Sequence, residues 1–293
     1  MIHSGLGNQM FMYATGRALA LRMNASLFLD ISRFPADLKY FRTYDLDQLP
    51  IKARVVNGGT ISSLLPLRVR LKAERTFRRP FIRNMCGFIT EESEGPWVRF
   101  EPRLLEPATR GSVVISGYWQ SERYFADHAE TIRKELMPVR TDHPVAVIDR
   151  QQIENSEHPV AICVRFHMDA PGQVANHVGI ISAFRRVVLE HAANNPRATY
   201  FLFTDQPAFF SDPQCLGIPF QIISHFPGKD TSRITLYSMT RCRDFILTFS
   251  SFHWWGAWLS PNPAKRVIYL RFNGLDRPNH IPDSWATRDV QES

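Results

Sequence analysis

Apolar positions near the start of the chain recur with the spacing of a helix. Between Gln9 and about Asn24 they fall three or four residues apart, which predicts a helix that buries one face. The short apolar run Ser26 to Asp30 follows and is typical of a buried parallel strand that ends in a loop. The positions that define the helical face are Phe11, Ala14, Ala18, Leu19 and Leu21.

Three later apolar runs predict further strands. Val113 to Tyr118 and Thr199 to Asp205 are each followed by helix-like sequence rather than by a hairpin turn. Pro159 to Val164 begins the second half of the chain in the same way. Strands that alternate with helices predict an α/β fold.

The stretch between Met137 and Pro159 has the composition of a connection between two lobes. It contains prolines and a mostly polar segment, Gln151 to His158. A chain of 293 residues is long enough for two domains. We therefore place an N-terminal lobe at residues 1–145 and a C-terminal lobe at residues 146–293.

Composition and charge narrow the class of protein. The chain is 44% hydrophobic and 22% charged, as globular proteins are, and its net charge of +7 should attract phosphates, acidic glycans or an anionic membrane face. Four cysteines without close spacing disfavour a disulfide framework or a zinc site. No run approaches the roughly 18 apolar residues of a membrane span, and the first residues lack signal-peptide order. We expect a soluble, cytoplasmic protein.

Basic residues recur at helical spacing from Arg68 to Arg83. They predict a helix with one strongly positive face, which can hold an anionic acceptor or lie peripherally against the inner membrane face. Most such faces are only solvated, and that alternative stays open. The basic residues are Arg68, Lys72, Arg75, Arg79 and Arg83.

Two glycines, Gly5 and Gly7, open the first predicted helix. Backbone amides and the positive helix end can approach a phosphate or a sugar hydroxyl there. A dinucleotide-binding fold would need a third glycine, where Met10 stands, and a complete preceding strand; Asp30 is its one supporting residue. A nicotinamide-dependent dehydrogenase is thus a distant alternative, and a tight turn without a ligand is another.

A second candidate site lies in the C-terminal half, where a β-rich run ends in Ser250 and Ser251 and then turns helical. Their hydroxyls and the helix N-terminus can bind a diphosphate. Alternatively, the two serines only cap the helix. The tryptophans that follow at helical spacing, Trp254, Trp255 and Trp258, are expected in the core.

Charged residues follow two of the predicted strands. Arg165 comes directly after Val164, at the strand edge where α/β sheets bind ligands, and a guanidinium there can hold two diphosphate oxygens. Asp205 ends another strand at the same edge and can accept hydrogen bonds from a ribose or a guanine. The pair Asp45 and Asp47 matches a metal-binding DxD pattern, but so short a pattern arises often by chance.

Three ordered segments are distinctive along the chain. The opening segment is Gly5-Leu6-Gly7-Asn8-Gln9-Met10-Phe11 with Tyr13-Ala14 and Gly16-Arg17-Ala18-Leu19-Ala20. The middle segment is Gly117-Tyr118-Trp119-Gln120-Ser121-Glu122-Arg123-Tyr124-Phe125, and the last is Ser250-Ser251-Phe252 with Trp254-Trp255-Gly256-Ala257-Trp258-Leu259. In content and in order, these segments make the chain similar to the α1,2-fucosyltransferase family across nearly its whole length.

The resemblance implies a GT-B-like enzyme: two Rossmann-like lobes with a cleft between them. It implies an inverting transfer of fucose from GDP-fucose, without a required metal, to a galactosyl-type glycan or lipid-linked oligosaccharide, in α1,2 linkage; nucleic acid is not an expected partner. Arg165 would neutralise the GDP leaving group, and Asp205 would lie near the nucleoside. Ser250, Ser251 and Phe252 would lie against the diphosphate, and the acceptor-side lobe would present Gly5, Gly7, Asn8 and Gln9.

The chain also departs from the family around Arg165. Cys163, Phe166 and Met168 stand where the family has histidine, arginine and aspartate, and Asp169 is displaced by one position. His167 and Asp169 are the remaining candidates for deprotonating an acceptor hydroxyl. These departures motivate one further alternative, a catalytically silent relative that binds nucleotide sugar or glycan.

Overall fold

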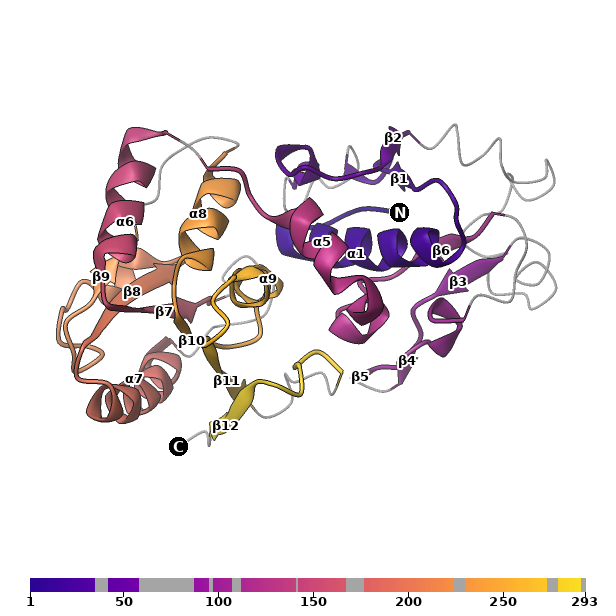
Figure 1. Ribbon diagram of the computed structural model, residues 1–293. Coiled ribbons are helices and arrows are strands. Elements are labelled where there is room, and N and C mark those ends of the chain that lie inside the picture. The colour runs from indigo at the N-terminus through magenta and orange to yellow at the C-terminus, as the bar shows by residue number, and fades with distance from the viewer. Residues whose placement is uncertain are drawn as a thin grey trace. The chain divides into compact units, whose positions relative to one another are not determined.

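The computed structural model describes residues 1–34, 42–57, 87–94, 97–106, 112–140, 142–166, 177–223, 230–272 and 279–290. The chain divides into two compact units (Figure 1). Unit 1 comprises Met1–Leu136 with Arg277–His280, and unit 2 comprises Met137–Asp276 with Ile281–Ser293. Within the described ranges, no helix is long and apolar enough to cross a membrane.

Unit 1 is built around one buried helix. Within the described ranges its helices are α1 (Leu6–Arg22) and α5 (Ala129–Leu136), with short 3-10 turns at Leu46–Gln48, Pro102–Leu104, Glu122–Tyr124 and Ala126–His128. Its strands are β1 (Phe28–Asp30), β2 (Arg54–Val56), β3 (Phe88–Thr90), β4 (Ser93–Glu94), β5 (Trp97–Val98) and β6 (Val114–Ser116). β1 pairs with β2 and β3 pairs with β6, both in parallel.

Polar side chains fix α1 inside unit 1. The buried carboxylate of Glu135, on α5, accepts hydrogen bonds from the Tyr13 hydroxyl and from the Arg17 guanidinium at 2.9 Å. Burial and the contact with Glu135 together raise the pKa of Tyr13, so its hydroxyl stays protonated. Two residues of the opening segment therefore join α1 to α5.

Unit 2 is a parallel sheet with helices around it. Its helices are α6 (Pro144–Asn155), α7 (His177–Asn194), α8 (Thr231–Thr240) and α9 (Ser251–Leu259), with a 3-10 turn at Pro207–Phe210. Its strands are β7 (His158–Val164), β8 (Ala198–Thr204), β9 (Gln221–Ile222), β10 (Asp244–Leu247), β11 (Arg266–Phe272) and β12 (Ala286–Val290). In Figure 1, α7 lies on one side of the sheet, and α6 and α8 lie on the other.

The six strands of unit 2 lie in the order β9-β8-β7-β10-β11-β12, all parallel. The chain runs outward from β7 through β8 to β9, returns to the other side of β7 and continues outward through β11. This is the order of a Rossmann sheet, whose direction of winding reverses between its two central strands. The reversal point of unit 2 is between β7 and β10.

Every residue of β7 is buried, because its side chains point alternately to two faces and both faces are covered. Val160, Ile162 and Val164 pack in one apolar cluster with residues of α7, including Phe184. Cys163 points to the opposite face, where its sulfur lies 3.9 Å from the sulfur of Met239 on α8. A strand covered by helices on both faces has no polar alternation, which is why the run from Pro159 to Val164 is continuously apolar.

The structure confirms the predicted helix at the start of the chain, the four predicted strands and the burial of Trp254, Trp255 and Trp258. The division between units, however, falls after Leu136 rather than after residue 145. Helix α6, which begins at Pro144, packs against α8 and so belongs to unit 2. In addition, Arg277–His280 belongs to unit 1 although it is distant in sequence.

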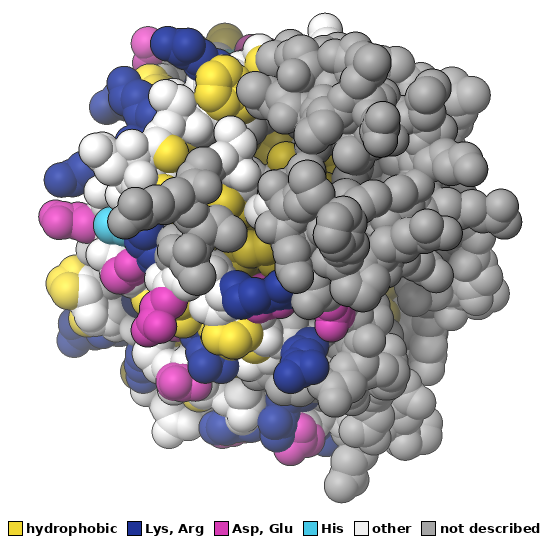
Figure 2. Space-filling model, turned by 90° about the vertical axis from the view of Figure 1, so that its right-hand side faces the viewer, with side chains coloured by type: hydrophobic (Ala, Val, Ile, Leu, Met, Phe, Trp, Pro, Cys, Tyr) yellow, Lys and Arg dark blue, Asp and Glu magenta, His cyan; other side chains and the backbone are white. Residues whose placement is uncertain are grey.

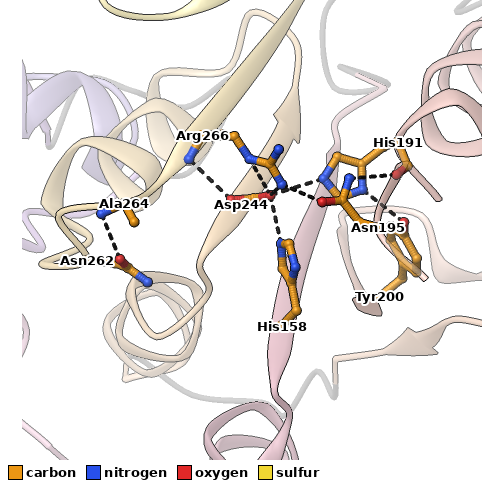
Figure 3. A network of polar contacts seen from close by, with 8 residues as sticks. All are labelled: His158, His191, Asn195, Tyr200, Asp244, Asn262, Ala264 and Arg266. Carbon is orange, nitrogen blue, oxygen red and sulfur yellow. Dashed lines mark hydrogen bonds and ion pairs between the residues drawn. The ribbon is translucent and has the colours of Figure 1, made fainter. Parts of the chain in front are cut away.

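A hub of polar contacts joins the amino ends of three strands (Figure 3). One oxygen of Asp244, the first residue of β10, is contacted by the imidazole Nε2 atoms of His158 at 2.8 Å and His191 at 3.1 Å. Arg266, the first residue of β11, donates to the same oxygen from Nη2 at 2.6 Å and Nε at 3.0 Å. The Tyr200 hydroxyl lies 2.9 Å from the other imidazole nitrogen of His191.

His158, His191 and Asp244 also have the side chains of a metal site, with ligand atoms within 4.8 Å of one another. The guanidinium of Arg266, however, already supplies the positive charge that this carboxylate would share with a metal ion. We therefore interpret the hub as a structural feature that holds the amino ends of the strands together. It lies at the sheet edge opposite Arg165, which follows the carboxyl end of β7.

Gly256, on α9, allows close packing of α8 against α9. A methyl group at this position would lie 1.9 Å from the Met239 sulfur and 2.6 Å from its Cγ. Gly256→Ala should therefore lower the free energy of unfolding by about 1–3 kcal/mol, measured by urea denaturation. In the Met239→Ala background the same substitution should cost much less, since the obstructing side chain is gone. Equal losses in both backgrounds would contradict this packing argument.

Candidate active site

Arg165 and the serine pair lie on either side of the reversal point of the unit 2 sheet. β7 and β10 are neighbours, and Cys163 pairs with Leu247. Arg165 is the first residue after β7, and Ser250 comes three residues after the end of β10. In open α/β sheets, ligands bind in the crevice outside the carboxyl ends of the strands at this reversal point. The topology thus brings two separate sequence candidates to one ligand-binding edge.

Helix α9 presents its N-terminus at this edge and is held at both ends. Ser250 is its N-cap, and the Ser250 Oγ accepts a hydrogen bond from the His253 amide at 3.4 Å. The capping that was the alternative interpretation of the two serines is thus present for Ser250, whereas Ser251 is the first residue of the helix. At the other end, the Lys265 ammonium donates to the carbonyls of Ala257, Trp258 and Ser260 at 2.9–3.0 Å. Ser251 and Phe252 follow the cap in the first turn and are half-buried. A rigid helix with its positive end at the strand edge suits an anion.

Asp205 lies beside Arg165 because their strands are paired. β7 and β8 are in register up to Val164 and Thr204, so the next residue of each strand reaches the same place. The Asp205 Oδ1 accepts a hydrogen bond from the Phe166 amide at 3.0 Å, and its Oδ2 lies 3.7 Å from the Arg165 Nε. Both side chains keep partial solvent access, 29% for Arg165 and 22% for Asp205.

The two candidate bases, His167 and Asp169, lie outside the described residues, and their assignment stays a prediction. The same holds for the basic residues Arg68, Lys72, Arg75 and Arg79, and therefore for the membrane contact predicted from them. On the face drawn in Figure 2, the described basic and acidic side chains are interspersed.

The glycine segment lies at the start of α1 in unit 1. Gly5 is the N-cap, with open space where a side chain would project, whereas Gly7 is buried. Gln9 is fully buried, and its amide bonds the backbone of Ser4, Thr43 and Asp45 at 2.7–3.0 Å. The side-chain NH₂ group of Gln9 donates two of these hydrogen bonds, and its side-chain oxygen accepts the third. Gln9 therefore has a structural role, because it fixes the loop after residue 42.

The opening and middle segments meet through one side-chain contact. The Gln120 amide donates to the Asn8 Oδ1 at 2.6 Å, while the Asn8 amide donates to the Ser4 hydroxyl at 2.9 Å. Asn8 is half-buried, so it lies at the surface end of this chain of contacts.

Glu91 is a residue that the sequence did not indicate. Its carboxylate accepts hydrogen bonds from the amides of Tyr118 at 2.7 Å and Trp119 at 2.8 Å, and it holds Trp119 at a φ of 54°. No local signal in the sequence marks Glu91, because the two amides that it contacts lie 27 and 28 residues further along the chain. A small pocket opens beside it, lined by Glu91, Arg99, Phe100, Gln120, Ser121, Tyr124, Asn279 and His280.

Comparison with known proteins decides the family. Residues 1–280 match the profile of glycosyl transferase family 11. The chain belongs to glycosyl transferase family 11. It is therefore a glycosyltransferase of the fucosyltransferase type, and the dehydrogenase alternative based on Gly5, Gly7 and Asp30 is wrong. Asp30 instead accepts a hydrogen bond from the Ser32 amide at 3.0 Å.

Among family relatives, the chain is 26% identical to an alpha-1,2-colitosyltransferase of Escherichia coli, over 96% of this chain and 95% of the relative. Two solved structures share its fold. NodZ alpha-1,6-fucosyltransferase, co-crystallized with GDP, has a TM-score of 0.52 and 15% identity, covering 91% of this chain and 92% of NodZ. A mutant of Arabidopsis thaliana FUT1 in complex with GDP has a TM-score of 0.51 and 12% identity, covering 95% of this chain and 70% of FUT1. The α/β fold of this glycosyltransferase is thus GT-B-like.

Proposed function

We propose that this glycosyltransferase moves fucose from GDP-fucose to a hydroxyl of a galactosyl-type glycan. The observation that carries the proposal is the position of Arg165 and of the α9 N-terminus, on the two strands that flank the reversal point of the unit 2 sheet. A guanidinium and a capped helix N-terminus at one sheet edge are suited to a diphosphate. The family and the GDP-bound structures of similar fold support a nucleotide-sugar donor.

The reaction needs negative charge to be stabilised on the departing nucleotide. The acceptor oxygen forms a bond to the anomeric carbon while the bond from that carbon to the β-phosphate oxygen breaks, which inverts the anomeric centre. The electron pair of the broken bond stays with GDP, where Arg165 and the α9 N-terminus would lie against it. The acceptor proton passes to a base, for which His167 and Asp169 are the candidates.

Metal independence is part of the proposal. Arg165 and the helix end supply positive charge at the diphosphate, the role that a divalent ion has in many other sugar transferases. Asp45, the first residue of the DxD pair, accepts a hydrogen bond from the Thr43 hydroxyl at 2.8 Å, and its amide donates to the buried Gln9 side chain. Transfer should therefore persist in EDTA and should not rise on addition of Mg²⁺ or Mn²⁺.

The similarity to the alpha-1,2-colitosyltransferase of Escherichia coli supports a second candidate donor, a nucleotide-linked colitose. Colitose is fucose without its 3-hydroxyl group. A site that hydrogen-bonds this hydroxyl discriminates strongly against the deoxy sugar, by roughly 10⁴-fold or more, whereas an apolar site discriminates weakly. The same relative supports an α1,2 linkage for this chain.

The two donors can be separated in one assay. Purified protein is incubated with GDP-fucose or GDP-colitose and a galactoside acceptor, and GDP release and product mass are followed. We expect inverted, α1,2-linked fucoside with a higher kcat/KM for GDP-fucose. A preference for GDP-colitose would show that colitose is the transferred sugar, and the protein would still be a glycosyltransferase. Donor binding with no product from any galactoside would instead support the silent relative.

A further inference from the structure

We propose that Asp205 is a positioning residue that holds Arg165 against the diphosphate, rather than a contact for the nucleoside. This inference rests on the proposed function, since it assigns a role within the same donor site. It also gives Phe166, which replaces an arginine of the family pattern, a part in building that site.

Both oxygens of the Asp205 carboxylate are directed at the segment that carries Arg165. Oδ1 accepts the Phe166 amide at 3.0 Å, which fixes the backbone immediately after Arg165. Oδ2 lies 3.7 Å from the Arg165 Nε, the guanidinium nitrogen nearest the backbone. An ion pair at Nε restricts the rotation of the guanidinium and so helps to fix its plane. A carboxylate used in this way has less capacity left for a ribose or a base.

Phe166 anchors the same segment from the apolar side. Its side chain is only 2% exposed and belongs to the core cluster of unit 2. Its ring meets that of Phe209 edge to face at 5.0 Å and that of Phe210 at 6.0 Å. Both partners lie in the 3-10 turn Pro207–Phe210, which follows Asp205. The segment after β7 is therefore tied to the segment after β8 by a polar contact and by aromatic packing.

These contacts explain how the donor site can operate with an altered family pattern. Precise placement of a charged group matters because a displacement of about 1 Å can lower turnover by roughly 100-fold. In this chain the placement of Arg165 is provided by the neighbouring strand. Phe166 thus marks a different way of holding Arg165, and its presence does not by itself indicate loss of activity.

The test compares Asp205→Asn with Arg165→Ala and with the double variant. Asparagine keeps an oxygen for the Phe166 amide but removes the charge that faces Arg165. We expect kcat to fall about 10-fold, with the KM for acceptor unchanged, because a weakened ionic contact misplaces the guanidinium. In the Arg165→Ala background, Asp205→Asn should have less than a twofold further effect. Effects that multiply in the double variant would show that Asp205 acts independently of Arg165 and would overturn the inference.

Nucleotide binding separates positioning from nucleoside contact. Calorimetry should show that Asp205→Asn lowers the affinity for GDP more than the affinity for GMP, as Arg165→Ala is also expected to do. An equal loss of affinity for both nucleotides in Asp205→Asn, but not in Arg165→Ala, would indicate that Asp205 contacts the nucleoside and would refute the positioning role. Asp212→Asn is the matched control, because exposed Asp212 also accepts a hydrogen bond from a backbone amide, that of Gln214 at 2.8 Å, and forms no ion pair with an arginine among the described residues.

Failure of the proposed function would look different. Wild-type protein that bound neither GDP nor GDP-fucose would refute the donor site as a whole, and with it the role of Asp205. Wild-type protein that binds GDP and transfers the sugar, combined with independent effects in the double variant, would refute the positioning role alone. Thermal unfolding of each variant shows whether a loss of activity reflects a loss of fold.

Discussion

Arg165→Ala should lower turnover by roughly 100-fold or more. A charged donor that acts on the developing negative charge of a leaving group contributes about 3 kcal/mol to the transition state, and each 1.4 kcal/mol corresponds to a factor of ten in rate. Arg165 is suited to this role because it follows β7 at the reversal point of the sheet and keeps 29% of its side chain accessible. Steady-state GDP release with a saturating acceptor measures the effect.

Two control variants make this result interpretable. Arg165→Lys keeps the charge but loses the planar fork of donors, and should recover only part of the activity. Arg197→Ala removes an exposed arginine, whose partner Glu157 is also exposed, and should leave turnover unchanged. If Arg165→Ala turned over at the wild-type rate, the diphosphate would have to be neutralised by other groups.

Asp244→Asn should lower the free energy of unfolding by about 3 kcal/mol or more. The carboxylate is almost completely buried, and Arg266 and two histidines are directed at one of its oxygens (Figure 3). Half-exposed Arg266 keeps its contact with solvent when the charge is removed, but the two buried histidines lose their partner. Removing one partner of a buried ionic contact typically costs about 3–5 kcal/mol. Urea denaturation measures the loss. Asp289→Asn, which breaks an exposed pair with Arg271, should cost less than about 1 kcal/mol.

The hub also predicts how stability depends on pH. Burial alone would raise the pKa of Asp244, but hydrogen bonds from His191, Arg266 and His158 outweigh burial and hold the pKa well below its ordinary value. The folded protein therefore binds this proton less readily than the unfolded chain does. The resulting stability is fully present above the unfolded pKa of about 4 and is lost as pH falls through the folded pKa.

Below pH 4, the urea midpoint of the wild-type protein should fall more steeply than that of Asp244→Asn, which has no carboxyl group to titrate at this position. Parallel pH profiles would show that other carboxylates control acid unfolding. The hub lies at the amino edge of the sheet, whereas the candidate donor site lies at the carboxyl edge. As a control, folded Asp244→Asn should therefore keep its transferase activity near neutral pH.

The sequence predicted the elements whose signal is local. The apolar run from Pro159 to Val164 predicts a buried strand because both of its faces are covered by helices, and the strand is present as β7. The capping role of Ser250 is equally local, since its partner is the amide three residues later. The boundary between the units was less accurate, because the packing of α6 on α8 depends on residues about 80 positions apart.

Contacts between distant segments could not be predicted in this way. Glu91 supports Tyr118 and Trp119 from 27 and 28 residues away, and nothing in its own surroundings in the sequence marks it. The proposed positioning role of Asp205 depends on a contact of the same kind. As an isolated strand-end carboxylate it was compatible with a nucleoside, and only the pairing of β7 with β8 placed it against Arg165 and the Phe166 amide.

By itself, the sequence determined the α/β class, the ordered segments shared with its family and the types of side chain available for a diphosphate site. Local periodicity and short-range capping are sufficient for those conclusions, because each depends on residues that are neighbours along the chain. The tertiary structure alone decided which candidates meet. The strand order put Arg165 and α9 on either side of one reversal point, joined Asp205 to Arg165 and gathered His158, His191, Asp244 and Arg266 at the opposite edge, because sheet pairing brings distant residues together in register.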